Sequence, residues 1–146
     1  MGDQKAIPGL ADLQDACRRR GLAVTIQRRA VFGELAGRRD HPTADQIYDA
    51  VRDGLPGLSR TTVYRVLETL VDAGLARKVH HPGGVARFDP MTGRHHHLSC
   101  EACGRLVDLD DSLVPPLRLP AGTGFRIKDY SVSFTGLCPA CSRKKG

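Results

Sequence analysis

Two Cys-x-x-Cys pairs stand far apart in the C-terminal third of this sequence, at Cys100-Glu-Ala-Cys103 and Cys138-Pro-Ala-Cys141. Four thiolates in two pairs suit a tetrahedral Zn(II) ion, and an all-sulfur set leaves no open coordination position. We therefore predict a structural zinc that ties the end of a small domain back to its first strand. Two independent redox pairs or free thiols are the alternative.

The remaining sequence features favour a cytoplasmic protein with an anionic partner. No apolar run is long enough to span a membrane, and the N-terminus lacks the apolar core of a signal peptide. In that compartment five cysteines indicate metal chemistry more than disulfides. Cys17 shares an apolar helix face with Leu10 and Leu13, so it is expected in the core. The formal charge of +6 favours nucleic acid, with a merely basic protein as the alternative.

The N-terminal part predicts four helices followed by a hairpin. Thr25, Thr43 and Ser59 are each placed to cap a helix, and Gln46 completes a capping box with Thr43. These caps predict helices that run to about Ala36, Gly54 and Gly74, after a first helix that ends near Gly21. The segments 75–80 and 85–88 predict two strands around the turn at 81–84.

The fourth helix carries the pattern that points to DNA. Its core stripe consists of Val63, Val66, Leu67 and Leu70. A second face with Thr61, Tyr64 and Arg65 suits a helix that lies in the major groove, although a solvated face would look the same. The basic hairpin that follows completes the winged-helix order, in which the hairpin can track a phosphate backbone. The predicted DNA contacts are Arg28, Thr61, Thr62, Tyr64, Arg65 and Lys78.

Three consecutive histidines lie next to the first cysteine pair. In a strand, His95 and His97 would point to one side and His96 to the other. Asp89 precedes the three histidines and Asp108 follows the first cysteine pair, so a metal site with mixed nitrogen and oxygen ligands can form. Such a site suits Fe(II) or Mn(II) and tolerates Zn(II). A solvated polar segment is the alternative.

The overall pattern predicts an α+β protein: an N-terminal winged-helix DNA-binding domain and a small C-terminal α/β dimerisation domain. The predicted boundaries are residues 1–88 for the first, a linker at 89–94, and 95–146 for the second. Strands are expected at 98–103, at 105–109 and within 125–137. Pro115, Pro116 and Pro120 would shorten or break a helix between them.

Six motifs in order resemble the ferric uptake regulator family across residues 10 to 142. They are Thr25-Ile-Gln-Arg28, His41-Pro-Thr-Ala-Asp-Gln-Ile-Tyr48, Ser59-Arg-Thr-Thr-Val-Tyr-Arg65, Arg87-Phe-Asp89, His95-His-His-Leu-Ser-Cys100 and Cys103-Gly-Arg-Leu-Val-Asp108. The resemblance implies a homodimeric repressor that binds an inverted-repeat operator in double-stranded DNA when metal closes the dimer. It also implies a helix in the dimerisation domain, which the prolines would interrupt, so the dimer geometry would differ from the family norm.

Within that family the sequence is most similar to the peroxide-responsive repressors. The resemblance implies a regulatory site for Fe(II) or Mn(II), and its ligands would be His41, Asp89, His95, His97 and Asp108. Iron-responsive members tend to carry glutamate where this chain has Asp89 and Asp108. By position, His41 and His95 would be oxidised when bound Fe(II) meets hydrogen peroxide.

Other functions remain open from the sequence. An iron or other divalent-metal uptake regulator would have the same architecture without the oxidation chemistry. A small non-haem metalloenzyme is a further alternative, but it leaves the winged helix unexplained and the sequence predicts no enzyme. Many iron-responsive members have one more histidine where this chain reads Lys128-Asp129-Tyr130, so an additional metal site is not expected.

Overall fold

The computed structural model describes residues 7–81 and 83–146, which leaves out the second residue of the turn at 81–84. The chain divides into two compact units, one that ends at Thr92 and one that begins at Gly93. We call them the N-terminal unit and the C-terminal unit. None of the helices in the described ranges combines the length and apolar character that crossing a membrane requires.

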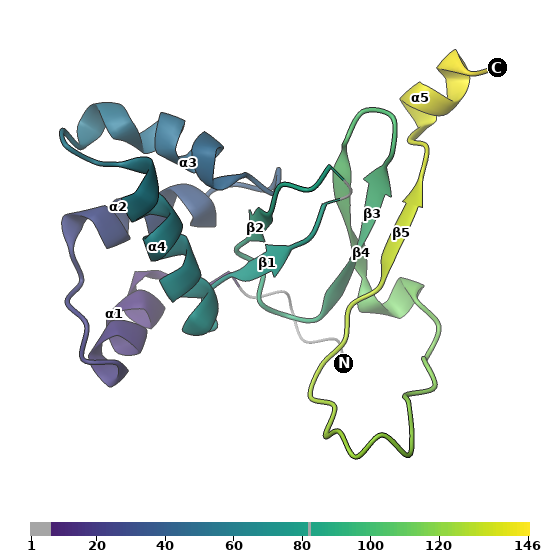
Figure 1. Cartoon of the computed structure of the whole chain (residues 1–146), viewed down its shortest axis with the longest axis horizontal. Helices are drawn as coiled ribbons and strands as arrows, with labels where there is room; N and C mark the ends of the chain where they lie inside the picture. Colours follow the sequence, from purple (N-terminus) through teal and green to yellow (C-terminus); the bar gives the residue numbers. More distant parts are fainter. Residues whose placement is uncertain (1–6, 82) are drawn as a thin grey trace. The chain divides into compact units, whose positions relative to one another are not determined.

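The N-terminal unit consists of four helices and a two-stranded hairpin (Figure 1). The elements in chain order are α1 Leu10–Arg19, α2 Ile26–Ala36, α3 Ala44–Val51, the short 3-10 helix η1 Arg52–Gly54, α4 Arg60–Asp72, β1 Arg77–Val79 and β2 Arg87–Asp89. The predicted caps are confirmed. The side chains of Thr25, Thr43 and Ser59 each accept a hydrogen bond from the backbone N–H three residues on. The Gln46 side chain in turn accepts the backbone N–H of Thr43, which completes the capping box. Since these local bonds satisfy the first N–H groups of each helix, they fix where it begins.

One apolar core holds the four helices together. The predicted stripe of α4 is buried, with Val63 and Leu67 fully so, and it packs with residues of the other helices and with Phe88 of β2. Cys17 lies in this core, as predicted. Because the buried side of α4 is committed to the core, its opposite face is the one left to solvent, and the structure supports a winged-helix unit.

The C-terminal unit contains a three-stranded sheet and one short α-helix (Figure 1). Its elements are β3 His95–Cys100, β4 Leu106–Asp110, the 3-10 helix η2 Asp111–Leu113, β5 Ser133–Gly136 and α5 Pro139–Lys144. The strand order is β4-β3-β5, with β3 antiparallel to β4 and parallel to β5. The first two strands begin within a few residues of their predicted positions.

The C-terminal unit departs from the sequence predictions at two places. The strand expected within 125–137 is only Ser133–Gly136, because the alternating residues Phe125 and Ile127 pair with no strand and are exposed. The short helix α5 was not predicted, although Pro139 at its first turn is a typical helix start. The expected effect of the prolines is confirmed, since residues 114–132 contain neither helix nor strand.

Candidate metal centres and recognition helix

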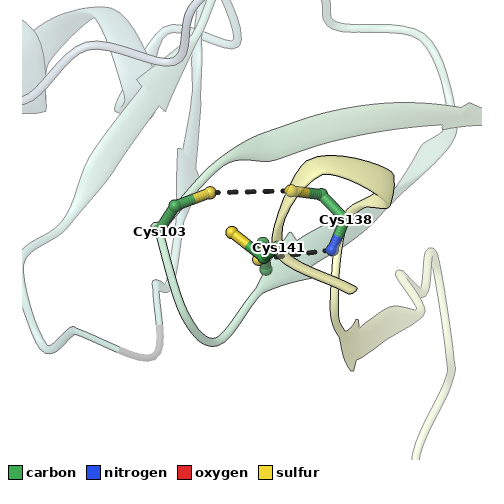
Figure 2. A group of neighbouring side chains, drawn as sticks. Cys103, Cys138 and Cys141 are labelled. Atoms are coloured by element: carbon green, nitrogen blue, oxygen red, sulfur yellow. Dashed lines mark hydrogen bonds between the residues drawn. The ribbon is translucent and has the colours of Figure 1, made fainter. Parts of the chain in front are cut away.

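Four cysteine sulfurs converge at one end of the C-terminal unit. The Sγ atoms of Cys100, Cys103, Cys138 and Cys141 all lie within 4.8 Å of one another. Figure 2 shows the sulfurs of Cys103 and Cys138 facing each other with Cys141 beside them, and the first two are 3.8 Å apart. That separation is far longer than a disulfide, and it matches the edge of about 3.8 Å that a tetrahedron with Zn–S bonds of about 2.3 Å would have.

Backbone geometry prepares this cluster for a cation. β3 ends at Cys100, and the Cys138 N–H donates to its Sγ at 3.3 Å. The N–H groups of Cys138 and Cys103 lower the pKa of Cys100 to about 6, whereas the neighbouring sulfur of Cys138 raises the pKa of Cys141 to about 12. Four thiolates repel one another, so a divalent cation is what would let all four ionise together. The donor set therefore fits zinc.

A second group of candidate ligands lies on one face of β3 and β4. His97 is directly opposite Asp108, and His95 lies two residues before His97 on the same face. The Nε2 atoms of both histidines are 3.4 Å from the same Oδ1 atom of Asp108. This is long for a hydrogen bond, but it fits ligand atoms that each lie about 2.1 Å from a shared ion.

The ring of His95 is held in the tautomer that metal binding needs. Its Nδ1 lies 2.8 Å from the carbonyl oxygen of Gly93, so Nδ1 donates the proton and Nε2 presents its lone pair. A histidine that ligates through one nitrogen usually fixes the other in this way. His95 and His97 are both buried, which limits competition from water.

The N-terminal unit contains the other two predicted ligands as a pair. The Nε2 atom of His41 is 3.3 Å from Oδ2 of Asp89, and both side chains are buried. The other carboxylate oxygen of Asp89 accepts the N–H of Met91 at 2.9 Å. His41 has φ of 51°, a left-handed conformation that costs a residue other than glycine roughly 1 kcal/mol or more.

Strand β2 holds that strained residue in place. The Arg87 guanidinium donates to the His41 carbonyl at 3.0 Å, and the Phe88 N–H donates to the Pro42 carbonyl at 2.9 Å. The segment before α3 is thus tied to the strand that ends in Asp89. Strain that the surroundings maintain at a predicted ligand position supports a functional constraint on its geometry.

His96 belongs to a different arrangement, which the sequence analysis missed. Its ring is fully buried; Nε2 donates to Asp111 at 2.8 Å, and Nδ1 accepts the Val132 N–H at 3.0 Å. The His96 ring stacks on Tyr130, with 5.8 Å between the ring centres. The Arg94 guanidinium lies 4.8 Å from the centre of the Tyr130 ring, and the Nε of Arg94 donates to Asp129. The segment Lys128-Asp129-Tyr130 therefore contacts β3 through Tyr130 and contacts Arg94, the residue before β3, through Asp129. The alternation of three histidines was the signal that one of them faces away from the other two.

The His96 contacts give a stability prediction. His96→Phe keeps an aromatic ring but leaves the partly buried Val132 N–H without its acceptor and removes the bond to Asp111. We expect the free energy of unfolding to fall by about 1–3 kcal/mol. Thermal unfolding checks it, with His80→Phe as the control because His80 is exposed. An unfolding curve like that of the parent would show that these contacts of His96 do not stabilise the C-terminal unit.

The predicted DNA-contacting residues fall into two groups in the structure. Thr61, Tyr64 and Arg65 are exposed on α4. The others make contacts within the protein: Thr62 with the capping Ser59, Arg28 with the Ala23 carbonyl at 2.7 Å, and Lys78 of β1 with Glu68 at 2.6 Å. The Lys78–Glu68 pair links the hairpin to α4, so it can hold the two elements in one geometry.

Comparison with known proteins identifies the family. A model of the ferric uptake regulator family matches residues 19–135. The chain belongs to the ferric uptake regulator family. It is 38% identical over 136 residues to the transcriptional regulator FurA of Mycobacterium tuberculosis, covering 91% of this chain and 92% of that one. It is 32% identical over 138 residues to the peroxide operon regulator of Bacillus subtilis, covering 93% and 95%.

Solved structures of the family have the same fold. The ferric uptake regulator of Helicobacter pylori aligns with a TM-score of 0.76 at 18% identity, covering 95% of this chain and 97% of that one, which supports the fold alone. The ferric uptake regulator of Vibrio cholerae aligns with a TM-score of 0.64 at 26% identity, covering 86% and 99%. This member of the family is thus a metal-dependent transcriptional regulator and not an enzyme.

Proposed function

We propose that this ferric uptake regulator family member is a homodimeric repressor that senses hydrogen peroxide through a single regulatory ion. Its ligands would be His41 and Asp89 from the N-terminal unit and His95, His97 and Asp108 from the C-terminal unit. The observation that carries the proposal is the convergence of His95 and His97 on one oxygen of Asp108. The likeness to peroxide regulators at 32% identity over almost the whole chain supports the branch.

The cofactors follow from the two donor sets. We propose Zn(II) in the four-cysteine cluster, where it would be structural, and Fe(II) or Mn(II) at the histidine and aspartate ligands. An ion held by both units would fix the angle between them. In a dimer that angle sets the spacing of two α4 helices, which must match half-sites about one helical turn apart. The ion can favour this state only through a higher affinity for it than for other arrangements.

Peroxide sensing requires the reduction of hydrogen peroxide. Bound Fe(II) would supply this chemistry, whereas bound Mn(II) would not. The protein's part is to present imidazole rings beside the ion. His95, held by Gly93, and His41, held on its strained backbone by β2, are the candidates for attack. The net change would transfer one oxygen atom of the peroxide to an imidazole carbon and leave the other as water. An oxidised ring is a poorer ligand, so the DNA-binding state loses stability.

The test compares the protein loaded with Fe(II) and with Mn(II). After peroxide, we expect the iron form to lose DNA binding and to gain an oxygen atom on the peptides that contain His41 or His95. The manganese form should do neither. The peptide with His80 and His81, which lie outside the ligand set, is the internal control. Release on chelation alone, with no oxygen added, would support a metal-uptake regulator instead.

The DNA-binding role of α4 gives a separate prediction. Arg65→Ala should weaken binding to an inverted-repeat duplex, selected from a random library, by about 10-fold or more, since a good base contact is worth about 1–3 kcal/mol. Fluorescence anisotropy of the Mn(II)-loaded protein measures it. Arg52→Ala is the matched control, because Arg52 is also an exposed arginine but lies in η1. Equal losses for both variants would show that α4 has no special part in reading the duplex.

A further inference from the structure

Two ion pairs connect α4 to its neighbours, one near each end of the helix. At its start, Nη1 of Arg60 lies 3.0 Å from Oδ1 of Asp45 in α3. Eight residues further along, Oε1 of Glu68 lies 2.6 Å from Nζ of Lys78 in β1. All four side chains are between 38% and 58% exposed, so both pairs lie on the surface of the N-terminal unit.

The two pairs flank the proposed DNA-binding face of α4. Arg60, Tyr64 and Glu68 are spaced four residues apart, so they follow one another along one side of the helix. Tyr64, between the pairs, is exposed. In a helix-turn-helix the helix before the reading helix crosses the phosphate backbone, and Asp45 lies in the first turn of α3, which holds that position. A duplex that contacts Tyr64 therefore brings phosphates close to both pairs.

Two contacts hold the Arg60 side chain against α3. Besides the Asp45 carboxylate, the Tyr48 ring lies under the guanidinium, with 4.5 Å between the guanidinium carbon and the ring centre. A cation over an aromatic face is attracted by the negative potential of the ring. Arg60 is also the first residue of α4, where the helix dipole disfavours a cation and the carboxylate offsets that cost. The arginine is thus directed toward α3 in the protein without DNA.

Each carboxylate competes with DNA phosphate for the cation that it holds. When a duplex approaches, the pair either stays closed or opens. In a closed pair the cation neutralises no phosphate. In an open pair the cation moves to a phosphate, but a bare carboxylate is left beside the polyanion, which repels it. Both results cancel the attraction that a free arginine or lysine would add, and that attraction supplies nearly all sequence-independent binding.

A purely structural role is the alternative for these pairs. Asp45 interacts favourably with the dipole of its own helix, and its bond to Arg60 links α3 to α4. Exposed ion pairs, however, contribute little to the stability of a fold. The chain has a formal charge of +6, yet it places carboxylates directly beside the face that would meet a polyanion. This placement is explained by an effect on DNA binding better than by one on stability.

We propose that Asp45 and Glu68 limit the binding of this regulator to DNA of unrelated sequence, because they keep Arg60 and Lys78 from the phosphates. The inference rests on the proposed DNA-binding role of α4 and adds which residues weaken its sequence-independent part. The exposed residues between the two pairs then supply a larger share of the affinity through base edges, which carry the sequence information. A weak attraction to phosphates also leaves the ion-dependent geometry to decide whether the operator is bound.

Asp45→Asn tests the first pair, since it keeps the shape of the side chain and removes its charge. For the Mn(II)-loaded protein and a random-sequence duplex, we expect the affinity to rise about 10-fold or more at about 0.1 M salt. The slope of log affinity against log salt should steepen by about two, one freed arginine for each subunit of the proposed dimer. Fluorescence anisotropy over a salt series measures both quantities.

Asp49→Asn is the matched control for this substitution. It removes the same charge from the same helix and also releases an arginine, Arg52, but that arginine lies in η1 and not beside α4. The slope for the control should stay near the parental value. Thermal unfolding shows that both variants are folded, because the loss of an exposed pair changes stability little.

A double variant shows whether the gain comes from Arg60. Adding Arg60→Gln to Asp45→Asn should return the affinity and the slope to parental values, because an absent pair attracts phosphates as little as a closed one. Glu68→Gln, with and without Lys78→Gln, repeats the comparison at the other end of α4. Equal slopes for Asp45→Asn and Asp49→Asn, or a gain that survives the loss of Arg60, would overturn the inference. A parent protein without preference for the selected inverted repeat over the random duplex would overturn the proposed function instead.

Discussion

Replacing Cys100 with serine is expected to remove zinc and unfold the C-terminal unit while the N-terminal unit stays helical. Structural zinc in small domains contributes apparent binding free energies of about 10–16 kcal/mol, as large as the whole stability of an ordinary domain. Among the described residues of the C-terminal unit, Val114 is the only buried apolar residue that this variant keeps to offset the loss. The N-terminal unit has its own apolar core and does not depend on the cluster.

Native mass spectrometry for zinc and circular dichroism for secondary structure measure this outcome. Cys17→Ala is the matched control, because it also removes a buried thiol but one that lies in the core of α1. The control should retain zinc, with at most a moderate loss of stability. A Cys100→Ser protein that still binds zinc and melts like the parent would show that the four sulfurs do not form one site.

Much of the fold follows from short-range signals. The caps at Thr25, Thr43 and Ser59 act over three residues, so the sequence locates where these three helices begin. The end of α3 was less well predicted, because the helix stops at Val51 and the 3-10 helix η1 continues to Gly54. Each Cys-x-x-Cys pair is also a local signal, because its two sulfurs are only three residues apart in the sequence. The prediction also placed His95 and His97 on one side of a strand, since that depends only on the alternation of side chains.

What the sequence could not supply depends on distant pairing. The segment 125–132 alternates like a strand, but a strand forms only where a partner is available, and β3 offers pairing only to Ser133–Gly136. The contact of His96 with Asp111 spans fifteen residues, so nothing near His96 announces it. The exposure of Phe125 and Ile127 is a property of the whole unit, and no pattern around them distinguishes an exposed loop from a strand.

The largest functional effect is expected from Asp108→Asn. The Nε2 atoms of His95 and His97 lie 3.4 Å from the same oxygen of Asp108, so an amide in its place removes the negative charge that they would share with an ion. We expect affinity for Mn(II) to fall by more than about 100-fold, beyond the 10- to 100-fold that changes behind a ligand cost. DNA binding should then no longer respond to Mn(II) at concentrations that saturate the parent.

The neighbouring aspartate provides a close control. Asp110→Asn makes the same substitution two residues further along β4, where the side chain caps η2 through Ser112 and an amide oxygen can still accept that bond. Titration calorimetry with Mn(II), at constant zinc content, should give parental affinity for this variant. An equal loss for Asp110→Asn and Asp108→Asn would point to a general effect of charge on the sheet and not to a ligand.

Combining Asp108→Asn with His41→Ala decides whether the two units share the ion. If His41 and Asp108 hold the same ion, either substitution alone removes tight binding and the double variant loses little more, because ligands of one site act together. If each unit binds its own ion, the losses of Mn(II) affinity in the two single variants are independent. The response of DNA binding to Mn(II) is then reduced by each single substitution and disappears only in the double variant. Only the first result allows an ion to fix the angle between the units, since an ion confined to one unit has equal affinity for every arrangement of the two and shifts none of them.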